Sequence, residues 1–268
     1  MTRRVRVIPT NLVGVNAVTA QTNHAFGRHI HEQFGVGVIE HGAQTSLSGR
    51  GIVEAGAGDT ISVNPGEVHD GIPIDGRART WRMLYFDPEL VLDAASDIGA
   101  GKGPRDEFAY PVRSDALLAA KTRALFDTIT RPDPIAPALR QHELMLDVFA
   151  QLLDGQPTSP SPGIPGAFIR LRAWIADDPA APLSLEDLAI ESGLSRFQVV
   201  RGFSKAFGLT PHAYLVQCRI NLARRLIESG HPLAESAFAS GFADQSHMTR
   251  HFVRQFGVPL GAFSRTRQ

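Results

Sequence analysis

The sequence has few cysteines, no net charge and no long apolar run. Cys218 is the only cysteine among 268 residues, which excludes an internal disulfide framework and favours a reducing cytoplasm. No stretch approaches 18 consecutive apolar residues, and no apolar segment of the secretory type follows the basic start MTRRVRVIPTNLVG. We therefore expect a cytoplasmic protein with neither a membrane span nor a secretory signal.

The net charge of zero hides an asymmetry along the chain. Residues 165–268 hold 12 of the 27 basic and 8 of the 27 acidic residues, a balance of +4, so residues 1–164 carry −4. A basic C-terminal part beside an acidic N-terminal part is typical of a nucleic-acid-binding module joined to a different domain. A solvated basic surface is the simpler alternative.

Strand-type segments occupy the first part of the chain. From residue 5 to about 90 the sequence is rich in glycine, Val and Ile in short runs, such as FGVGVIEHG at 34–42 and TWRMLYFDP at 80–88. Several short strands at close spacing predict a sandwich or a small barrel. We assign residues 1–112 to this domain.

Apolar residues at helical spacing begin after residue 112. Residues 113–155 predict two helices separated by Pro132 and Pro134. The segment 156–165 lies in the run DGQPTSPSPGIPG, which cannot continue a helix and predicts a linker. Residues 166–268 predict an all-helical domain, so the expected fold class of the whole chain is α+β.

Two segments of the helical domain share one pattern, which is a short helix, a turn glycine, an N-capping residue and a second helix. Their parts are, in chain order, 184–192, Gly193, Ser195 and 196–207, and then 232–240, Gly241, Asp244 and 245–256. This is the pattern of the helix-turn-helix. Two copies in tandem indicate more than a chance match.

The second helix of each copy has one apolar and one polar face. The residues predicted to face inward at four-residue spacing are Val199, Phe203, Phe207, Met248, Phe252 and Phe256. The residues predicted to face outward are Arg196, Phe197, Val200, Arg201 and Lys205 in the first helix, and Gln245, Ser246, Thr249, Arg250 and Arg254 in the second. Arg, Gln and Thr are side chains that recognise bases in the major groove of DNA. The alternative is a solvated helix face.

His247 and His251 lie four residues apart and could form a metal-binding pair on one helix face. No Glu follows His247 directly and no third ligand is close in sequence. We therefore favour DNA recognition for this helix.

The sequence of both helix-turn-helix segments resembles a known protein family. LEDLAIESGLSRFQVVRGFSKAFGLTPHAYLVQCRINLARRLIESG and GFADQSHMTRHFVRQFGVPLGAF, within residues 184–265, resemble the AraC/XylS-type DNA-binding domain. The resemblance implies two helix-turn-helix units bridged by a helix at 211–229, which place their second helices in major grooves roughly 34 Å apart. It implies base-facing roles for Phe197, Val200, Arg201, Gln245, Ser246, Thr249 and Arg250. LAESAFASG departs from the family pattern at Ser236 and Phe238.

Histidines stand out in the N-terminal domain. His29 and His31 are one residue apart, so on a strand they face the same side, and His69 follows a Pro-Gly turn. The pattern resembles the cupin barrel, to which AraC-type sensor domains are related, and implies a small-molecule effector. The expected effector contacts are His29, His31, Glu67, His69 and Trp81. A divalent metal held by His29, His31 and His69 is the alternative, although Glu32, Glu40 and Glu67 miss the position of the cupin glutamate.

These features predict a sequence-specific transcription regulator controlled by a small-molecule effector. We expect no catalytic residues and no required cofactor, with a divalent metal in the barrel as the open alternative. The expected partners are double-stranded promoter DNA, the effector, a second copy of the chain bound through the helices at 113–155, and RNA polymerase if the protein is an activator. Those helices could instead simply pack on the barrel. The alternative functions are a cupin-type metal-dependent enzyme with an accessory helical domain and an architectural protein that binds all DNA equally.

Overall fold

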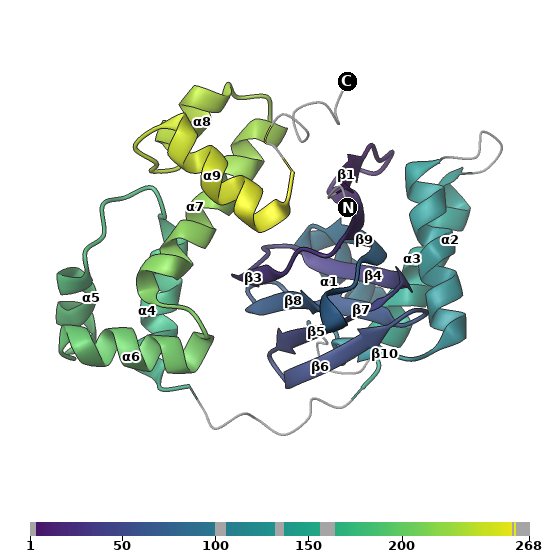
Figure 1. Ribbon diagram of the computed structural model, residues 1–268, viewed down its shortest axis with the longest axis horizontal. Coiled ribbons are helices and arrows are strands. Elements are labelled where there is room, and N and C mark those ends of the chain that lie inside the picture. The colour runs from purple at the N-terminus through teal and green to yellow at the C-terminus, as the bar shows by residue number, and fades with distance from the viewer. Residues whose placement is uncertain (1–3, 100–105, 132–136, 156–163, 259, 261–268) are drawn as a thin grey trace. The chain divides into compact units, whose positions relative to one another are not determined.

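The computed structural model describes residues 4–99, 106–131, 137–155, 164–258 and 260. The chain divides into two compact units, Met1–Pro157 and Thr158–Arg267. Within the described residues the first unit contains all the strands and helices α1 to α3, and the second contains α4 to α9 (Figure 1). Most of the predicted linker 156–165, and Pro132 and Pro134, lie outside the described residues. In the part of the chain that is described, no helix is both long and apolar enough to cross a membrane.

The strands of the first unit form two antiparallel sheets. The strands are β1 (Arg4–Ile8), β2 (Val15–Thr22), β3 (Phe26–His29), β4 (Phe34–His41), β5 (Ala43–Ser48), β6 (Gly51–Gly56), β7 (Thr60–Val63), β8 (His69–Pro73), β9 (Arg79–Phe86) and β10 (Val112–Arg113), with a short 3-10 helix η1 (Ile74–Gly76) before β9. The strand order is β1-β2-β9-β4-β7-β10 in the larger sheet and β3-β8-β5-β6 in the smaller one. The predicted β-structure of this region is confirmed.

Strand β9 shows how the larger sheet separates two environments. Leu84 and Phe86 belong to the core that the sheet shares with the helices, whereas Trp81 and Tyr85 contact Phe26 and His31. Because successive side chains of a strand point to opposite faces, alternate residues of β9 serve the two environments. The face that carries Trp81 and Tyr85 is therefore turned toward β3 and the segment that follows it.

Three helices cover the other face of the larger sheet, namely α1 (Pro88–Ile98), α2 (Ala116–Thr130) and α3 (Pro137–Leu153). Their buried side chains, such as Leu118, Leu125 and Phe149, form one apolar core with Leu84 and Phe86 of the sheet. The helices at 113–155 therefore pack on the β-structure, and pairing of two chains through their exposed faces stays a prediction. The sequence analysis missed α1, which starts at Pro88 immediately after β9.

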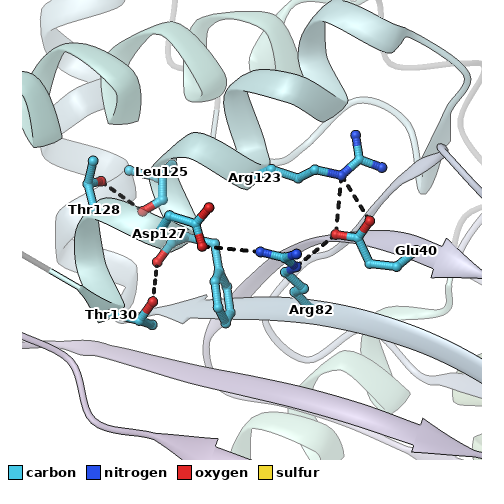
Figure 2. A network of polar contacts seen from close by, with 8 residues as sticks. Glu40, Arg82, Arg123, Leu125, Asp127, Thr128 and Thr130 are labelled. Atoms are coloured by element: carbon cyan, nitrogen blue, oxygen red, sulfur yellow. Dashed lines mark hydrogen bonds and ion pairs between the residues drawn. The ribbon is translucent and has the colours of Figure 1, made fainter.

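A charged network also joins α2 to the sheet. Glu40 accepts from Arg82 at 2.8 Å and from Arg123 of α2 at 3.0 Å, and Arg82 also pairs with Asp127 at 3.2 Å (Figure 2). Only 15% of the Glu40 side chain is exposed. This carboxylate therefore lies between two arginines that belong to different elements.

The second unit contains the two predicted helix-turn-helix pairs. Its helices are α4 (Gly166–Asp177), α5 (Leu185–Ser192), α6 (Arg196–Phe207), α7 (Pro211–Glu228), α8 (Leu233–Ala239) and α9 (Gln245–Phe256). Gly193 and Gly241 take left-handed backbone conformations in the two turns, with φ of 67° and 82°, which glycine adopts without strain. The α+β fold class with a C-terminal helix-turn-helix domain is confirmed.

Candidate DNA-binding surface and histidine cluster

The second helix of each pair begins at a side-chain cap. Ser195 and Gln198 form a reciprocal capping box at the start of α6, and the Asp244 carboxylate accepts from the amide of His247 at 2.7 Å at the start of α9. Both caps satisfy backbone N–H groups that have no partner within the helix. The predicted starts of both helices are therefore confirmed. With the start of each helix known, helical periodicity determines which residues share a face.

The inward faces agree with the predicted stripes. Val199 and Phe203 of α6 and Met248 and Phe252 of α9 are completely buried. Phe207 is also buried, whereas Phe256, at the end of α9, is only half-buried. The opposite faces of both helices are consequently turned to solvent.

The predicted outward residues of α6 are accessible. Arg196, Phe197, Arg201 and Lys205 are exposed and Val200 is half-buried. Phe197 is 71% exposed, so its ring is accessible to a partner at the surface. Arg196 lies 3.4 Å from Glu186 in an exposed ion pair.

The outward residues of α9 have a similar arrangement. Gln245, Ser246, Arg250 and Arg254 are exposed, and Thr249 is half-buried. The hydroxyl of Thr249 donates to the carbonyl of Gln245 at 2.7 Å, so its methyl group and the lone pairs of its oxygen remain for an external partner.

The two outward faces carry basic residues at equivalent positions. Counted from the first residue of each helix, the sixth position holds Arg201 in α6 and Arg250 in α9, and the tenth holds Lys205 and Arg254. Each helix therefore presents two cations one turn apart on its exposed side. Cations in this arrangement can contact both base edges and phosphates.

His247 and His251 are engaged with each other rather than exposed on that face. Their Nε2 atoms lie 3.1 Å apart, and Phe242 packs against both rings. One imidazole must therefore donate and the other accept. These two histidines belong to no group of three or more potential metal ligands among the described residues.

Three histidines of the first unit converge. His29, His31 and His69 each offer a ligand atom, and these atoms all lie within 4.8 Å of one another. His29 and His69 are paired across β3 and β8, with ring centroids 4.3 Å apart. The backbone carbonyl of His31 accepts from the amide of Gly66 at 2.7 Å, which ties the segment after β3 to the Pro-Gly turn before His69. The structure therefore brings together three of the five predicted effector contacts.

Burial keeps two of these imidazoles neutral. Burial, together with the neighbouring charge of His69, lowers the pKa of His29 to about 3, and burial lowers the pKa of His69 to about 4. The Nδ1 atom of His29 donates to the carbonyl of Gly27 at 2.7 Å, and that of His69 donates to the carbonyl of Glu67 at 3.0 Å. In each ring the Nε2 atom then carries the free lone pair.

Trp81 lies along the same face of β9 as Tyr85, whose ring centroid is 4.8 Å from that of His31. Arg79, at the start of this strand, is 1% exposed and donates to Gln44, His24 and Gly71. Its guanidinium lies 4.8 Å from the Trp81 ring centroid, and burial lowers its pKa to about 10. Sequence reasoning missed Arg79 and Tyr85, although the alternation in RTWRMLY puts both on the face of Trp81.

Glu67 binds backbone amides of two loops. Its carboxylate accepts from the amide of Gly49 at 2.8 Å and from the amide of Asn64 at 3.1 Å, so it holds two loops together. Within the described residues, the group of potential metal ligands consists of the histidines and includes no carboxylate. Glu67 as an effector contact stays a prediction.

Two family models match the chain in the order of its two units. The AraC-like ligand binding domain matches residues 13–153, and a helix-turn-helix domain matches residues 188–266. Together they cover the histidine cluster and both candidate DNA-reading helices.

Known proteins with similar sequences are named as regulators or resistance proteins. The chain is 30% identical over 227 residues to the uncharacterized HTH-type transcriptional regulator YbfI of Bacillus subtilis (strain 168), which covers 83% of this chain and 81% of YbfI. It is 36% identical over 87 residues to the multiple antibiotic resistance protein MarA of Escherichia coli (strain K12), covering 32% of this chain and 68% of MarA. The crystal structure of an apo ToxT variant from Vibrio cholerae is similar in fold, with a TM-score of 0.60 at 10% identity over 97% of this chain and all of that chain.

Proposed function

The chain belongs to the AraC family of transcriptional regulators, in which an AraC-like ligand-binding domain precedes a helix-turn-helix domain, and from this we propose how it reads DNA and what controls it. It is a DNA-binding transcriptional regulator with a ligand-binding N-terminal unit. Its relatives are regulators and not enzymes, so the alternative of a metal-dependent enzyme with an accessory helical domain is set aside.

The recognition surface that we propose consists of the exposed faces of α6 and α9. The observation that carries this proposal is the repetition of Arg201 and Lys205 as Arg250 and Arg254 at the same positions of two helices that each begin at a side-chain cap. Charged residues on one exposed face of a single helix are common, but an arrangement repeated in both units supports a shared role. The full set of proposed DNA contacts is Arg196, Phe197, Val200, Arg201, Lys205, Gln245, Ser246, Thr249, Arg250 and Arg254.

Different chemistry divides these residues into two roles. Arg201 and Arg250, in the middle of each helix, are suited to bidentate contacts with guanine, and Gln245 to contacts with adenine. Lys205 and Arg254, one turn further on, are suited to phosphates, which position the protein without reading sequence. The exposed ring of Phe197 is suited to the methyl group of thymine.

The effector site that we propose lies in the first unit. It consists of His29, His31 and His69 together with Trp81. His31 contacts Tyr85 and Phe26 contacts Trp81 on the face of β9 opposite the one that packs on the helices. A ligand that binds there would contact β3, β8 and β9 together, so it could change the stability of this unit. That is the property a ligand needs in order to shift a conformational equilibrium.

The second copy of the chain is the proposed protein partner. Leu117 of α2 and Leu139 of α3 are 63% and 69% exposed, and two subunits that pair through these helices would place four reading helices on one operator. Contact with RNA polymerase is proposed for the case in which the protein is an activator. Because the proposed target is promoter DNA, the location that we propose is the cytoplasm.

Selection of DNA sites from a random library by the purified full-length chain tests the proposed function. We expect enrichment of one site, an affinity that falls steeply with salt because bound phosphates release counterions, and a loss of about 1–3 kcal/mol with relaxed preference at one base pair for Arg250→Ala. Arg201→Ala should relax a different position, in the half of the site read by α6. The matched control is Arg170→Ala, an exposed arginine of α4 outside both faces.

Equal affinity for selected and random DNA would instead identify an architectural protein. If Arg250→Ala keeps wild-type discrimination at every position, the assignment of α9 as a reading helix is wrong.

A further inference from the structure

The histidine cluster has the donor set of a transition-metal site. All three ligand atoms belong to imidazoles, and they lie within 4.8 Å of one another. Nitrogens bound at about 2.0–2.1 Å to one ion lie roughly 3 to 3.4 Å apart in tetrahedral or octahedral geometry. Adjustments of roughly 1 to 2 Å at the ring ends would therefore bring them to bonding distance.

The rings are also oriented as metal ligands usually are. The carbonyls of Gly27 and Glu67 hold the Nδ1–H groups of His29 and His69. A histidine that binds a metal generally donates its other N–H to a carbonyl or carboxylate, which fixes the tautomer and the ring orientation. These two backbone bonds leave the Nε2 lone pairs of His29 and His69 available to bind an ion.

The surroundings suit a borderline ion rather than magnesium or calcium. The nearby carboxylates are engaged elsewhere, because Glu67 binds the amides of Gly49 and Asn64 and Asp70 accepts from the amide of Leu47 at 2.6 Å. Magnesium and calcium require oxygen ligands, whereas imidazole nitrogens suit zinc, nickel, copper, iron or cobalt.

Three protein ligands do not complete the coordination of such an ion. Structural zinc sites use four protein ligands, whereas sites with three leave a position for water or a small molecule. The ring of Tyr85, 4.8 Å from His31 between ring centroids, and the aromatic face of β9 line the same region. An ion here could be reached by a ligand bound against Trp81.

We propose that His29, His31 and His69 bind one divalent transition-metal ion through one ring nitrogen each, which is Nε2 in His29 and His69, and that this ion forms part of the effector site. The regulatory half of this inference rests on the proposed function, whereas the binding half does not. The ion contacts β3, β8 and the segment between β3 and β4 at once, so its binding should stabilise the first unit and change the affinity of the chain for DNA.

Metal binding is tested on the tag-free, full-length chain after treatment with a chelator. We expect one tightly bound ion per chain with Zn²⁺ or Ni²⁺, a visible absorption spectrum of nitrogen-coordinated Co²⁺, and a raised Tm with Zn²⁺ but not with Mg²⁺. His31→Gln and His69→Gln should lose the Co²⁺ spectrum and the Tm increase while keeping the circular dichroism spectrum of the apo protein. A folded variant that keeps full occupancy would overturn the proposed site.

Two control variants separate this site from other histidines. His41→Gln changes an exposed histidine of the same unit and should leave binding unchanged. The double variant His247→Gln with His251→Gln removes the other close imidazole pair and should also keep the tight ion. Loss of the ion in this double variant, with retention in His69→Gln, would place the metal on α9 and refute the inference.

The regulatory half is measured as DNA affinity with and without Zn²⁺, on the site selected as described above. We expect a change of at least about tenfold, absent in His69→Gln. A bound ion with unchanged DNA affinity would refute the regulatory half and leave the site standing. If the chain binds the ion but selects no DNA site, the proposed function is contradicted. If the chain retains no ion but selects a DNA site, only the metal-binding inference is contradicted.

Discussion

The Nε atom of Arg219 donates a 2.7 Å hydrogen bond to the carbonyl oxygen of Pro179. Arg219 belongs to α7, and Pro179 lies in the segment that leads into the first helix-turn-helix pair. The Nη2 atom of Arg219 also donates to the carbonyl of Ala181 at 3.3 Å. Arg219 lies against the turn of the second pair as well, because a Cβ atom added at Gly241 would lie 2.9 Å from its Nε. One side chain thus contacts segments of both helix-turn-helix pairs.

Arg219→Met should therefore destabilise the second unit. Methionine keeps much of the volume but leaves the two carbonyls without their donor, which costs about 1–3 kcal/mol of unfolding free energy. Urea unfolding followed by circular dichroism measures the loss. The control Arg170→Met removes an exposed arginine and should change the midpoint little. Equal midpoints for the two variants would show that Arg219 does not hold these segments.

At Gly202, α4 packs on α6, the first candidate reading helix. A Cβ atom there would lie 2.1 Å from Cζ of Phe168, a residue that is 9% exposed. Gly202→Ala should lose about 1–3 kcal/mol through overpacking, although alanine is otherwise favoured in a helix.

Two further variants test this explanation. Gly166→Ala places a methyl group in α4 where the nearest contact is Arg170 at 3.8 Å, and it should be neutral or slightly stabilising. Phe168→Leu should relieve part of the cost of Gly202→Ala in a double-mutant cycle. Additive effects of the two substitutions would contradict a direct clash.

Glu40 is the carboxylate that pairs with both Arg82 of the sheet and Arg123 of α2 (Figure 2). Glu40→Gln leaves Arg82 and Arg123 without their shared carboxylate, and because each arginine is 34% exposed the expected loss is about 1 kcal/mol. Asp127→Asn removes one pair of a 51% exposed carboxylate and should cost less than about 0.5 kcal/mol. Chemical denaturation at low and high salt checks both values, and equal losses would contradict this ranking.

The His247–His251 pair predicts a pH dependence of stability. Burial, and then the charges of His247, Arg254, His212 and Arg250, lower the pKa of His251 below its usual value. The unfolded chain therefore takes up this proton first, so stability is full above about pH 6.5 and falls as the pH is lowered. His251→Gln should show a weaker fall in Tm between about pH 7.5 and 5.5, and an unchanged slope would exclude this pair as a contributor.

Local features of the second unit could be predicted from the sequence. Ser195 and Asp244 cap the helices that follow them, and Gly193 and Gly241 form the turns, because each acts on neighbours within a few residues. The buried stripe from Val199 to Phe207 follows from helical periodicity in the same way. These short-range rules also fixed which residues face outward, although their contact with DNA stays a proposal.

The candidate ligand site depended on contacts between distant residues. The spacing of His29 and His31 indicates a shared face, but only the pairing of β3 with β8 sets His69 opposite His29. The same pairing brings Gly71 to the guanidinium of Arg79, which no local pattern indicated. Glu67 is bonded to the backbone amides of Gly49 and Asn64, which the loops bring to it, and its contact with the effector stays a prediction.

The sequence by itself determined the two-part organisation and which faces of the two candidate DNA-reading helices are exposed, because caps, turns and periodicity act within one or two helical turns. Only the tertiary structure decided that three histidines meet and that Tyr85 contacts one of them. Strand register across the sheets is set by the packing of the whole unit, and a shift of one residue would turn these side chains to the opposite face.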